Sequence, residues 1–484
     1  MTNQEMKQRL DRIIEGIREK YHVPSIVVSV HKDGESFFCG GGLANVEENV
    51  PADENTIYAI ASASKAFIAT AVCILCDEGK CHLDKPVKTY LPDFEMYDSY
   101  MTEHLTVRDA LGHRSGLPRH DIMWLNDRDI TIYDVVHRLR YLPPAFEPRA
   151  RMHYQNLMFT LATVLTEKLS GQPWQDFVTE RILKPLGMTR TYLKASDYRG
   201  KVPNQAEPYR YRNGQLERME YNDISHLGSC GCISSTVHDL DCWARLQLGR
   251  GQFEGKRVFS EKMADQLHCP QMIIKPGEMT AYDFPEVDFT CYGQGWFIES
   301  YRGHKLVHHG GTIDGFKSLV GFLPNDGVCF SVLTNLNRNQ SPAALGYIIS
   351  DLALGLSEID WAGRFWDFME STLHQAQEEE KKIEDAIKNA PAQSRPNGDY
   401  AGEFFHPGYG RLTVREQDGG LVMHILCKDM QMLPAGYDLF CVDGRSEGAG
   451  YVPVRFNYDL TGAVVSLSAP LEPMCAPIVF DKQK

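Results

Sequence analysis

The chain has 484 residues, of which 43% are hydrophobic and 24% charged, an ordinary composition for a globular protein with room for two or three domains. Its formal net charge of −14 argues against nucleic acid or an anionic membrane as a partner. Residues 1–7 lack the pattern of a secretion signal, and no stretch reaches the roughly 18 apolar residues of a membrane span. With 13 scattered cysteines, an odd number, this predicts a reducing, cytoplasmic location.

Hydrophobic periodicity predicts that the two ends of one domain share a sheet. Residues 4–20 have helical spacing, strands follow, and a helix begins near Ser62. Helices and loops are expected to about residue 250, and strands return from about residue 290. This order favours an α+β domain over residues 1–355, with an antiparallel sheet made from both termini and helices inserted between them. The expected strands are 25–30, 36–40, 293–299, 305–308, 319–323 and 328–334.

The pattern changes after residue 356. Residues 357–390 have the apolar start and charged continuation of one connecting helix, and a linker rich in helix breakers follows at 391–398. From 399 to 484, short strands alternate with glycine turns, which is typical of a small all-β domain, a barrel or a sandwich. Its expected strands are 410–414, 421–426, 437–442, 452–458 and 463–468.

The segment with the clearest chemistry runs from Ser62 to Lys65, an S-x-x-K pair at the start of an apolar run. On a helix, positions i and i+3 share a face, so the lysine amine can lie beside the serine hydroxyl. A serine hydroxyl is a weak nucleophile, and a neighbouring amine whose pKa is lowered by apolar surroundings can take its proton. The spacing therefore predicts covalent acyl transfer through Ser62.

Other patterns in the chain imitate functional motifs. Ser29 and Lys32 have the same spacing, but on the expected strand they point to opposite faces, so we interpret Ser29 as structural. Ser446 fits G-x-S-x-G, but a loop and a strand follow where a nucleophile elbow needs a helix, so we interpret it as a turn serine. The cysteines within 73–81 have apolar neighbours and no second cluster with zinc-site spacing, so no metal is expected.

A serine–lysine site also needs a proton relay and donors for an oxyanion. A Y-x-N triplet at Tyr154 and Asn156 and an H-x-G triplet at His309 and Gly311 follow Ser62 along the chain. In this order the chain resembles the serine β-lactamase-related family of class C β-lactamases, penicillin-binding DD-peptidases, D-aminopeptidases and esterases. The resemblance covers about residues 8–350. Further matching motifs are L-D-K-P-V at 83–87, L-T-V-R-D-x-L-x-H-x-S-G-L-P at 105–118, L-K-P-L-G-M at 183–188 and Y-G-Q-G-W at 292–296.

The resemblance implies a fold and three catalytic roles. The family fold is an α/β sandwich of an antiparallel sheet and a helical domain, with the site between them. Ser62 would form the acyl-enzyme, while Lys65 and Tyr154 would share general-base and general-acid duty. No metal and no organic cofactor is implied.

The resemblance also implies how substrate would be held. Asn156 would hydrogen-bond the substrate amide or Lys65, and His309 and Gly311 would line the strand at the edge of the cleft. Backbone N–H groups of Ser62 and Thr312 would form the oxyanion hole.

One position departs from the β-lactamase pattern. Those enzymes usually have K-T-G as the third motif, and the charged lysine helps bind the drug's carboxylate, whereas this chain has His309 there. Histidine is mostly neutral near pH 7, so we expect weaker carboxylate recognition. The H-x-G variant is familiar in the peptidase and esterase branches. Arg119 and Lys317 are alternative anion contacts, although a surface charge is the simpler interpretation of each.

The stretch 399–414 is similar to a lipocalin-like β domain appended to some family members. Such a domain would cover the cleft, mediate assembly of identical chains, or only pack against its neighbours. The partner expected for the whole protein is a small molecule or short peptide.

The favoured function is hydrolysis of short peptides, amides or esters through an acyl-enzyme. An acyltransferase with an alcohol or amine acceptor is the close alternative. A β-lactamase is in doubt because of His309, and a wall-modifying carboxypeptidase is disfavoured because no export signal is seen. A non-catalytic penicillin-binding module would not need Lys65 beside Ser62.

Overall fold

The computed structural model describes residues 1–484 except 279–281, 283, 392, 446–449 and 484. Its larger part contains a nine-stranded antiparallel sheet of order β10-β11-β12-β13-β14-β15-β1-β2-β3. Val28 of β1 pairs with Val332 of β15, so the prediction that both termini of one domain form this sheet is confirmed. The strands are β1 (Ser25–Lys32), β2 (Glu35–Asn45), β3 (Val50–Pro51), β10 (Met272–Ile274), β11 (Val287–Tyr292), β12 (Phe297–Tyr301), β13 (His304–Ile313), β14 (Phe316–Leu323) and β15 (Val328–Thr334).

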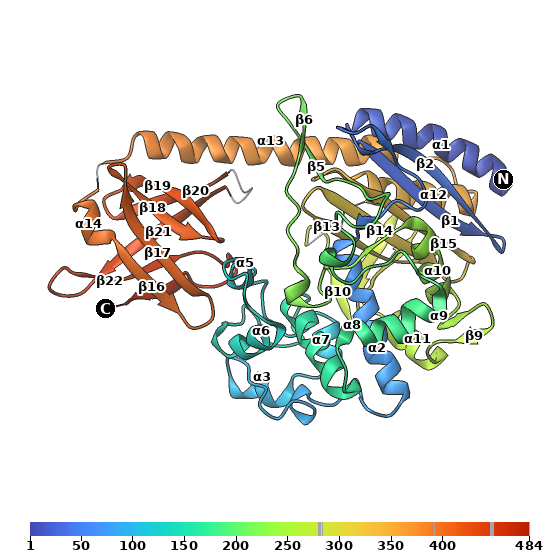
Figure 1. Ribbon diagram of the computed structural model, residues 1–484, viewed down its shortest axis with the longest axis horizontal. Coiled ribbons are helices and arrows are strands. Elements are labelled where there is room, and N and C mark those ends of the chain that lie inside the picture. Colours follow the sequence, from blue (N-terminus) through green and yellow to red (C-terminus); the bar gives the residue numbers. More distant parts are fainter. Residues whose placement is uncertain (279–281, 283, 392, 446–449, 484) are drawn as a thin grey trace.

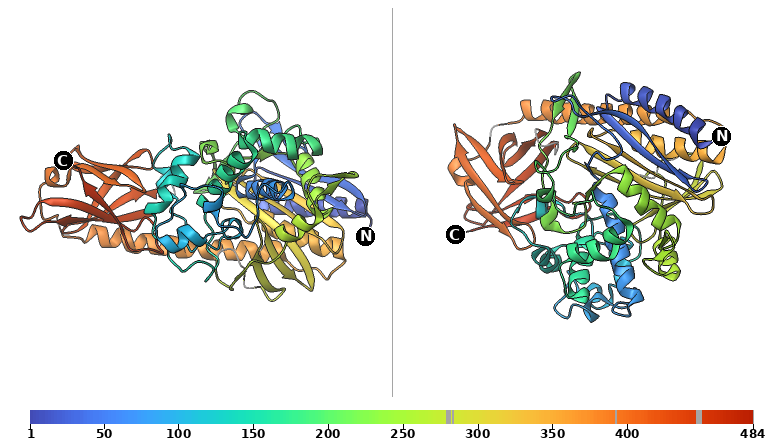
Figure 2. Two further views of the ribbon diagram at one scale, coloured as in Figure 1. Left: turned by 90° about the horizontal axis from the view of Figure 1, so that it is seen from below. Right: turned by 45° about the vertical axis from the view of Figure 1, so that its right-hand side comes forward.

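Helices cover both faces of this sheet (Figure 1, Figure 2). On one face α1 and α12 pack on side chains such as Val28 and Val332. On the other face α2, α7 and α10 share a second core with side chains such as Val27 and Val320, since alternate residues of a strand point to opposite faces. The α/β sandwich is confirmed. Its helices are α1 (Asn3–Lys20), α2 (Lys65–Asp77), α3 (Ser99–His104), α4 (Val107–Leu111), α5 (Ile122–Leu125), α6 (Ile132–Arg138), α7 (Leu157–Ser170), α8 (Trp174–Val178), α9 (Lys184–Leu186), α10 (Val237–Leu248), α11 (Glu261–Leu267) and α12 (Ser341–Leu354).

The helix that follows Ser62 lies in the middle of this second core. Every residue of α2 from Lys65 to Leu75 is buried, as expected of a helix that is apolar all round. Phe67 stacks on Trp243 of α10 with ring centroids 3.8 Å apart. The start of α2 is therefore held between the sheet and the other helices.

One long helix connects the larger part to the C-terminal strands. Helix α13 (Trp361–Lys388) has 28 residues and is about 42 Å long at 1.5 Å per residue. Near its start, Trp361 is buried against the sheet and donates through Nε1 to Asp351. Near its other end, Glu384 pairs with Arg445 of the C-terminal part. Of the helices within the described residues, none is long and apolar enough to cross a membrane.

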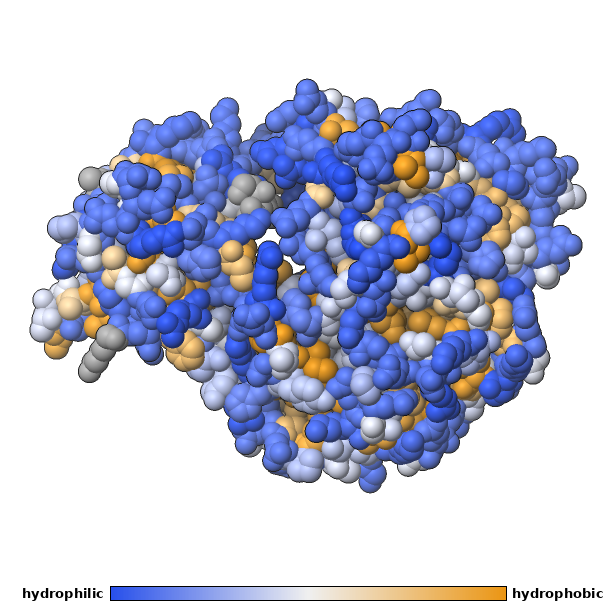
Figure 3. Space-filling view, viewed as in Figure 1, coloured by the Kyte–Doolittle hydropathy of each residue, from blue (hydrophilic) through white to orange (hydrophobic). Residues whose placement is uncertain are grey.

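The C-terminal part is a closed barrel of eight strands, each paired with the next and β16 paired with β23. Of the two predicted architectures, the barrel is confirmed. Its interior is filled by buried side chains, including Phe404, Phe440, Phe456 and Phe480. On the face seen in Figure 3, a hollow separates the barrel from the larger part. The strands are β16 (Gly402–His406), β17 (Gly410–Gln417), β18 (Gly420–Ile425), β19 (Lys428–Gly436), β20 (Leu439–Gly444), β21 (Gly450–Tyr458), β22 (Val464–Ala469) and β23 (Ile478–Lys482), preceded by α14 (Asn397–Tyr400).

Candidate active site

A strained turn presents Ser62 just before α2. Ala61 has φ of 47°, in the left-handed region that alanine disfavours. Ser64 Oγ donates to Ala61 O at 2.6 Å, and Ile60 N donates to Ile233 O at 2.9 Å. Such strain persists only where the surroundings enforce the backbone, and these two contacts hold the turn with Ser62 partly exposed.

The buried Lys65 amine is surrounded by three oxygen atoms. Its Nζ lies 3.1 Å from Ser62 Oγ, 2.8 Å from Asn156 Oδ1 and 2.6 Å from the carbonyl oxygen of Cys230. The Asn156 and Cys230 oxygens can only accept, so they take two N–H bonds and the remaining position on nitrogen faces Ser62. In the ammonium form that position donates to Ser62; in the neutral amine it holds the lone pair that can take the serine proton.

The amide of Asn156 is oriented by Asp121. Its Nδ2 donates to Asp121 Oδ1 at 3.1 Å, which leaves Oδ1 directed at Lys65. The same Asp121 oxygen accepts from Trp124 Nε1 at 3.1 Å, and the other oxygen pairs with Arg119 at 2.6 Å. A continuous chain of polar contacts therefore runs from Arg119 through Asp121 and Asn156 to Lys65.

Tyr154 lies over this lysine. The Lys65 Nζ is 4.9 Å from the centroid of the Tyr154 ring. The ring packs at 4.4 Å from His113 and 6.1 Å from His309. Its hydroxyl is buried and has no hydrogen-bond partner among the residues that the structure describes. A buried orphan donor is rare, and here it is a hydroxyl beside a serine–lysine pair.

Strand β13 closes the other side of Ser62. A Cβ on Gly311 would lie 2.1 Å from Ile60 O and 2.8 Å from Ser62 N, so only glycine allows this approach. The neighbouring strand adds a hydrogen bond from Ser318 Oγ to Ile60 O at 2.7 Å. Thr312 follows Gly311 and is exposed. The backbone of β13 therefore borders the predicted nucleophile.

His309 belongs to this strand, and its side chain is buried and does not project into solvent. It is 1% exposed. Its Nδ1 lies 2.7 Å from Gly310 O, an acceptor, so Nδ1 carries the proton and Nε2 accepts from Tyr292 Oη at 3.1 Å. Burial first, then the charge of Lys65, lowers the pKa of His309 to about 3. The ring is therefore neutral, and both nitrogens have partners within the protein.

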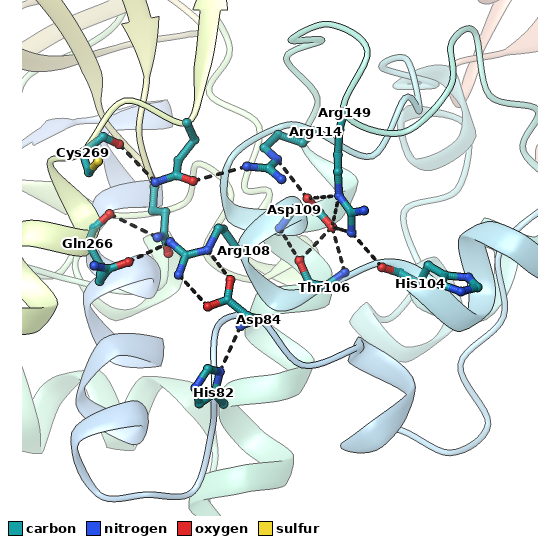
Figure 4. Close-up of polar contacts among 12 residues, drawn as sticks. His82, Asp84, His104, Thr106, Arg108, Asp109, Arg114, Arg149, Gln266 and Cys269 are labelled. Carbon is teal, nitrogen blue, oxygen red and sulfur yellow. Dashed lines mark hydrogen bonds and ion pairs between the residues drawn. The ribbon is translucent and has the colours of Figure 1, made fainter.

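A buried carboxylate holds the segments that contain His113 and Tyr154. Asp109 is fully buried and pairs with Arg114 at 2.9 Å and Arg149 at 2.7 Å (Figure 4). Burial raises its pKa, but hydrogen bonds from Arg149 and Thr106 outweigh this, so the pKa is lowered. His153 N donates to His113 O at 3.2 Å, which ties the two segments together beside the site.

The two alternative anion contacts behave differently. Arg119 keeps half of its side chain exposed, but its guanidinium carbon lies 5.8 Å from the Tyr154 ring centroid, so it belongs to the site's rim. Lys317 alternates with Ser318 along β14 and therefore points to the α12 face, away from Ser62. It is not an open surface charge either: it is partly buried, and its Nζ donates to Gln340 Oε1 at 2.7 Å.

The structure separates the imitating motifs from the site. Ser29 is buried in β1 and its hydroxyl lies 2.6 Å from that of Ser331, so its interpretation as structural is confirmed. Ser446 lies outside the described residues. Among the described residues, no group of three or more His, Cys, Asp or Glu side chains could hold a metal ion.

Three residues of the site were missed by sequence reasoning: His113, Asp121 and Tyr292. His113 and Tyr292 fall within motifs that match the family, at 105–118 and 292–296, and these motifs are the available signal for them. Asp121 and Tyr292 act through partners distant in sequence, Asn156 and His309. Without the fold, nothing connects those pairs.

Comparison with known proteins places this geometry in a family. The Beta-lactamase family model matches residues 10–354. The chain belongs to this family. A second model, a domain of unknown function called DUF3471, matches residues 387–482, the barrel.

Relatives with similar layouts include a fungal enzyme and an archaeal protein. The unguisins hydrolase ungD' of Aspergillus campestris is 26% identical, over 97% of this chain and 90% of the relative. The octameric penicillin-binding protein homologue of Pyrococcus abyssi has a TM-score of 0.63 at 21% identity, covering 98% of this chain and 99% of the homologue. The D-amino acid amidase of Ochrobactrum anthropi has a TM-score of 0.55 at 25% identity, covering 68% of this chain and 91% of the amidase.

Proposed function

We propose that this protein is a serine hydrolase that cleaves amide or ester bonds of small substrates through an acyl-enzyme on Ser62. The observation that carries the proposal is the position of the Lys65 amine. Two of its bonds are directed at fixed acceptors and the remaining position faces Ser62 Oγ at 3.1 Å. An amine held in this way is suited to take a proton from one particular hydroxyl.

The proposed reaction uses that geometry. Lys65 Nζ takes the Ser62 proton as Oγ attacks the substrate carbonyl carbon, and the carbonyl oxygen becomes an oxyanion facing the N–H groups of Ser62 and Thr312. Tyr154 passes a proton to the leaving nitrogen or oxygen as its bond to carbon breaks. Water then attacks the acyl-enzyme with the roles reversed, which releases the acid and restores Ser62.

Amides of D-amino acids and short peptides are the first substrates to test. The D-amino acid amidase is a structural neighbour of this chain, and the unguisins hydrolase resembles nearly the whole chain. The neutral, enclosed His309 supplies no charge for a drug's carboxylate, which disfavours penicillins as good substrates. Self-association is also worth measuring in solution, since the similar Pyrococcus abyssi protein is octameric.

The test is intact-mass spectrometry after brief mixing with three acyl donors: a p-nitrophenyl ester, a D-alanyl p-nitroanilide and a penicillin. We expect the mass of an acyl group on the wild-type protein and none on Ser62→Ala. If wild type and Ser62→Ala release p-nitrophenol or p-nitroaniline at the same rate, the proposal is wrong. A donor whose turnover rises with added alcohol or amine, with the acyl group recovered on that acceptor, identifies an acyltransferase instead.

A further inference from the structure

The polar chain that ends at Lys65 continues into the C-terminal barrel. Its link is His120, which lies between Arg119 and Asp121 and is fully buried. Its backbone N donates to Glu472 Oε2 at 2.9 Å, and its Nδ1 lies 2.6 Å from Tyr409 Oη. Both partners belong to the barrel: Tyr409 lies in the turn between β16 and β17, and Glu472 follows β22.

The hydrogen-bond directions at His120 are determined. Its Nε2 lies 2.9 Å from the carbonyl oxygen of Pro143, which can only accept, so Nε2 carries the proton. Burial lowers the pKa of the ring, which is neutral, and Nδ1 therefore accepts from the Tyr409 hydroxyl. The backbone N and Nδ1 of His120 are therefore hydrogen-bonded to the barrel, and its Nε2 is hydrogen-bonded to Pro143.

The backbone conformation of His120 requires these contacts. Its φ is 48°, in the left-handed region that a residue with a Cβ rarely adopts. Such a conformation persists only where the surroundings enforce it. The residue on its C-terminal side is Asp121, whose Oδ1 orients the Asn156 amide toward Lys65. A relaxation of His120 would therefore move the carboxylate that fixes Asn156.

Other barrel contacts surround the same segment. Asn126, at the end of α5, donates through Nδ2 to Arg411 O at 2.9 Å and accepts through Oδ1 from Leu426 N at 2.7 Å. In Figure 1, α5 lies at the side of the larger part that faces the barrel. These contacts place the barrel against 119–126 without reaching Ser62 directly.

We propose that Tyr409 and Glu472 of the barrel are positioning residues of the catalytic centre, acting through His120 and Asp121 on the Asn156–Lys65 contact. The proposal rests on the proposed function, because it assigns the barrel a part in acylation of Ser62. It does not require any barrel atom to touch substrate. It requires that loss of one hydroxyl in the barrel slow the chemistry at a distant lysine.

The test compares Tyr409→Phe with Tyr400→Phe. Both tyrosines belong to the C-terminal part and are fully buried, and each hydroxyl makes a hydrogen bond of 2.6 Å, to His120 and to Asp438 respectively. We measure the rate constant of adduct formation with the p-nitrophenyl ester, since a rate constant does not depend on the fraction of folded protein. Because small displacements of catalytic groups cost up to about 100-fold, we expect Tyr409→Phe to be slower by about 10-fold or more and Tyr400→Phe to match wild type. Equal rate constants in the two variants overturn the proposal.

A double-mutant cycle identifies the route. In an Asp121→Asn background, the further effect of Tyr409→Phe should disappear, because the coupling passes through that carboxylate. If the two effects multiply instead, the barrel acts by another route and the proposal is wrong.

Hydrogen exchange separates failure of this proposal from failure of the proposed function. Amides of 116–126 should exchange faster in Tyr409→Phe than in Tyr400→Phe, whether or not any donor is turned over. If amides of 116–126 exchange faster in Tyr409→Phe but no donor acylates the wild-type protein, the barrel does hold this segment and the proposed hydrolase function is rejected. Unchanged exchange with normal wild-type acylation rejects the positioning role alone.

Discussion

The two faces of the large sheet use the same residue types in different ways. On the face covered by α2, Lys65 is buried among three oxygens and lies next to a serine. On the face covered by α1 and α12, Lys317 donates to one acceptor among the described residues, Gln340 Oε1. Ser29 and Lys32 repeat the spacing of Ser62 and Lys65, but the strand divides them between the two faces. The spacing of a motif acquires chemistry only when a helical turn brings its members to one side.

The largest expected effect comes from the two serines. Ser62→Ala should abolish turnover of any donor that acylates the wild-type protein, because among the described residues Ser62 supplies the one hydroxyl that is hydrogen-bonded to Lys65. Ser29→Ala should retain full activity and lose about 1 kcal/mol of stability, because it leaves the buried Ser331 hydroxyl without its partner. Turnover assays and denaturant titrations of both variants check this. If Ser62→Ala turns a donor over at the wild-type rate, Ser62 is not the nucleophile and the face covered by α2 has been assigned the wrong role.

Tyr154→Phe tests the buried hydroxyl beside Lys65 that has no hydrogen-bond partner among the described residues. Loss of a general acid–base group usually costs on the order of 10²-fold or more in kcat. The matched control is Tyr198→Phe, another buried tyrosine, whose hydroxyl accepts from Ser234 at 3.0 Å away from this site. We expect near-normal kcat in the control. Similar rates for the two variants would mean that Lys65 works without a tyrosine.

Asp109→Asn tests the support beneath His113 and Tyr154. Removing one partner of a buried ion pair costs about 3–5 kcal/mol, because the remaining charges lose their counterpart. Asp84→Asn, which breaks the more exposed pair with Arg108, should cost about 1 kcal/mol or less. The pKa of Asp109 is lowered in the fold, so its contribution is present above the pKa of the unfolded chain and is lost as the pH falls through the folded value. The free energy of unfolding should differ strongly between wild type and Asp109→Asn at pH 7, and less at pH 3. An equal loss of stability in Asp109→Asn and Asp84→Asn at pH 7 would contradict this prediction.

The sequence predicted the sheet well where strands are buried and long. The expected 25–30 and 328–334 correspond to β1 and β15, which are covered on both faces. The expected strand 293–299 begins too early. Gly293 N donates to Trp296 O in a turn, and β12 starts only at Phe297. Strands β10 and β11, at the sheet edge, have weak patterns and were not predicted.

The barrel shows the same limit. Five of its strands were expected, but β16, β19 and β23 were not. Strand β19 contains Pro434 and ends at Gly436, residues that interrupt a strand pattern in sequence. The register with its neighbour shifts between those two residues, and the strand is kept by pairing on both sides. The domain limits at 355 and 398 stay predictions.

For the site, local spacing was informative and distant partners were not. The Ser62–Lys65 contact follows from one helical turn. The orientation of Asn156 by Asp121, and the enclosure of His309 by Tyr292, depend on how loops and strands far apart in sequence meet. Hydrophobic periodicity does not predict these contacts, because they form only when both hydrophobic cores have formed.

The smallest effect on activity is expected on the opposite face of the sheet. Burial lowers the pKa of Lys317 to about 8. At pH 7 the side chain is charged in the folded and the unfolded chain, so the fold bears the cost of a partly desolvated charge, and stability rises as the pH increases from about 8 through the unfolded value. Lys317→Met keeps the length without the charge, and should add on the order of 1 kcal/mol at pH 7 with kcat unchanged. Thermal unfolding from pH 7 to pH 10.5 should show this advantage shrinking. A loss of activity in Lys317→Met would mean that this face takes part in the chemistry, and the contrast between the two lysines would no longer hold.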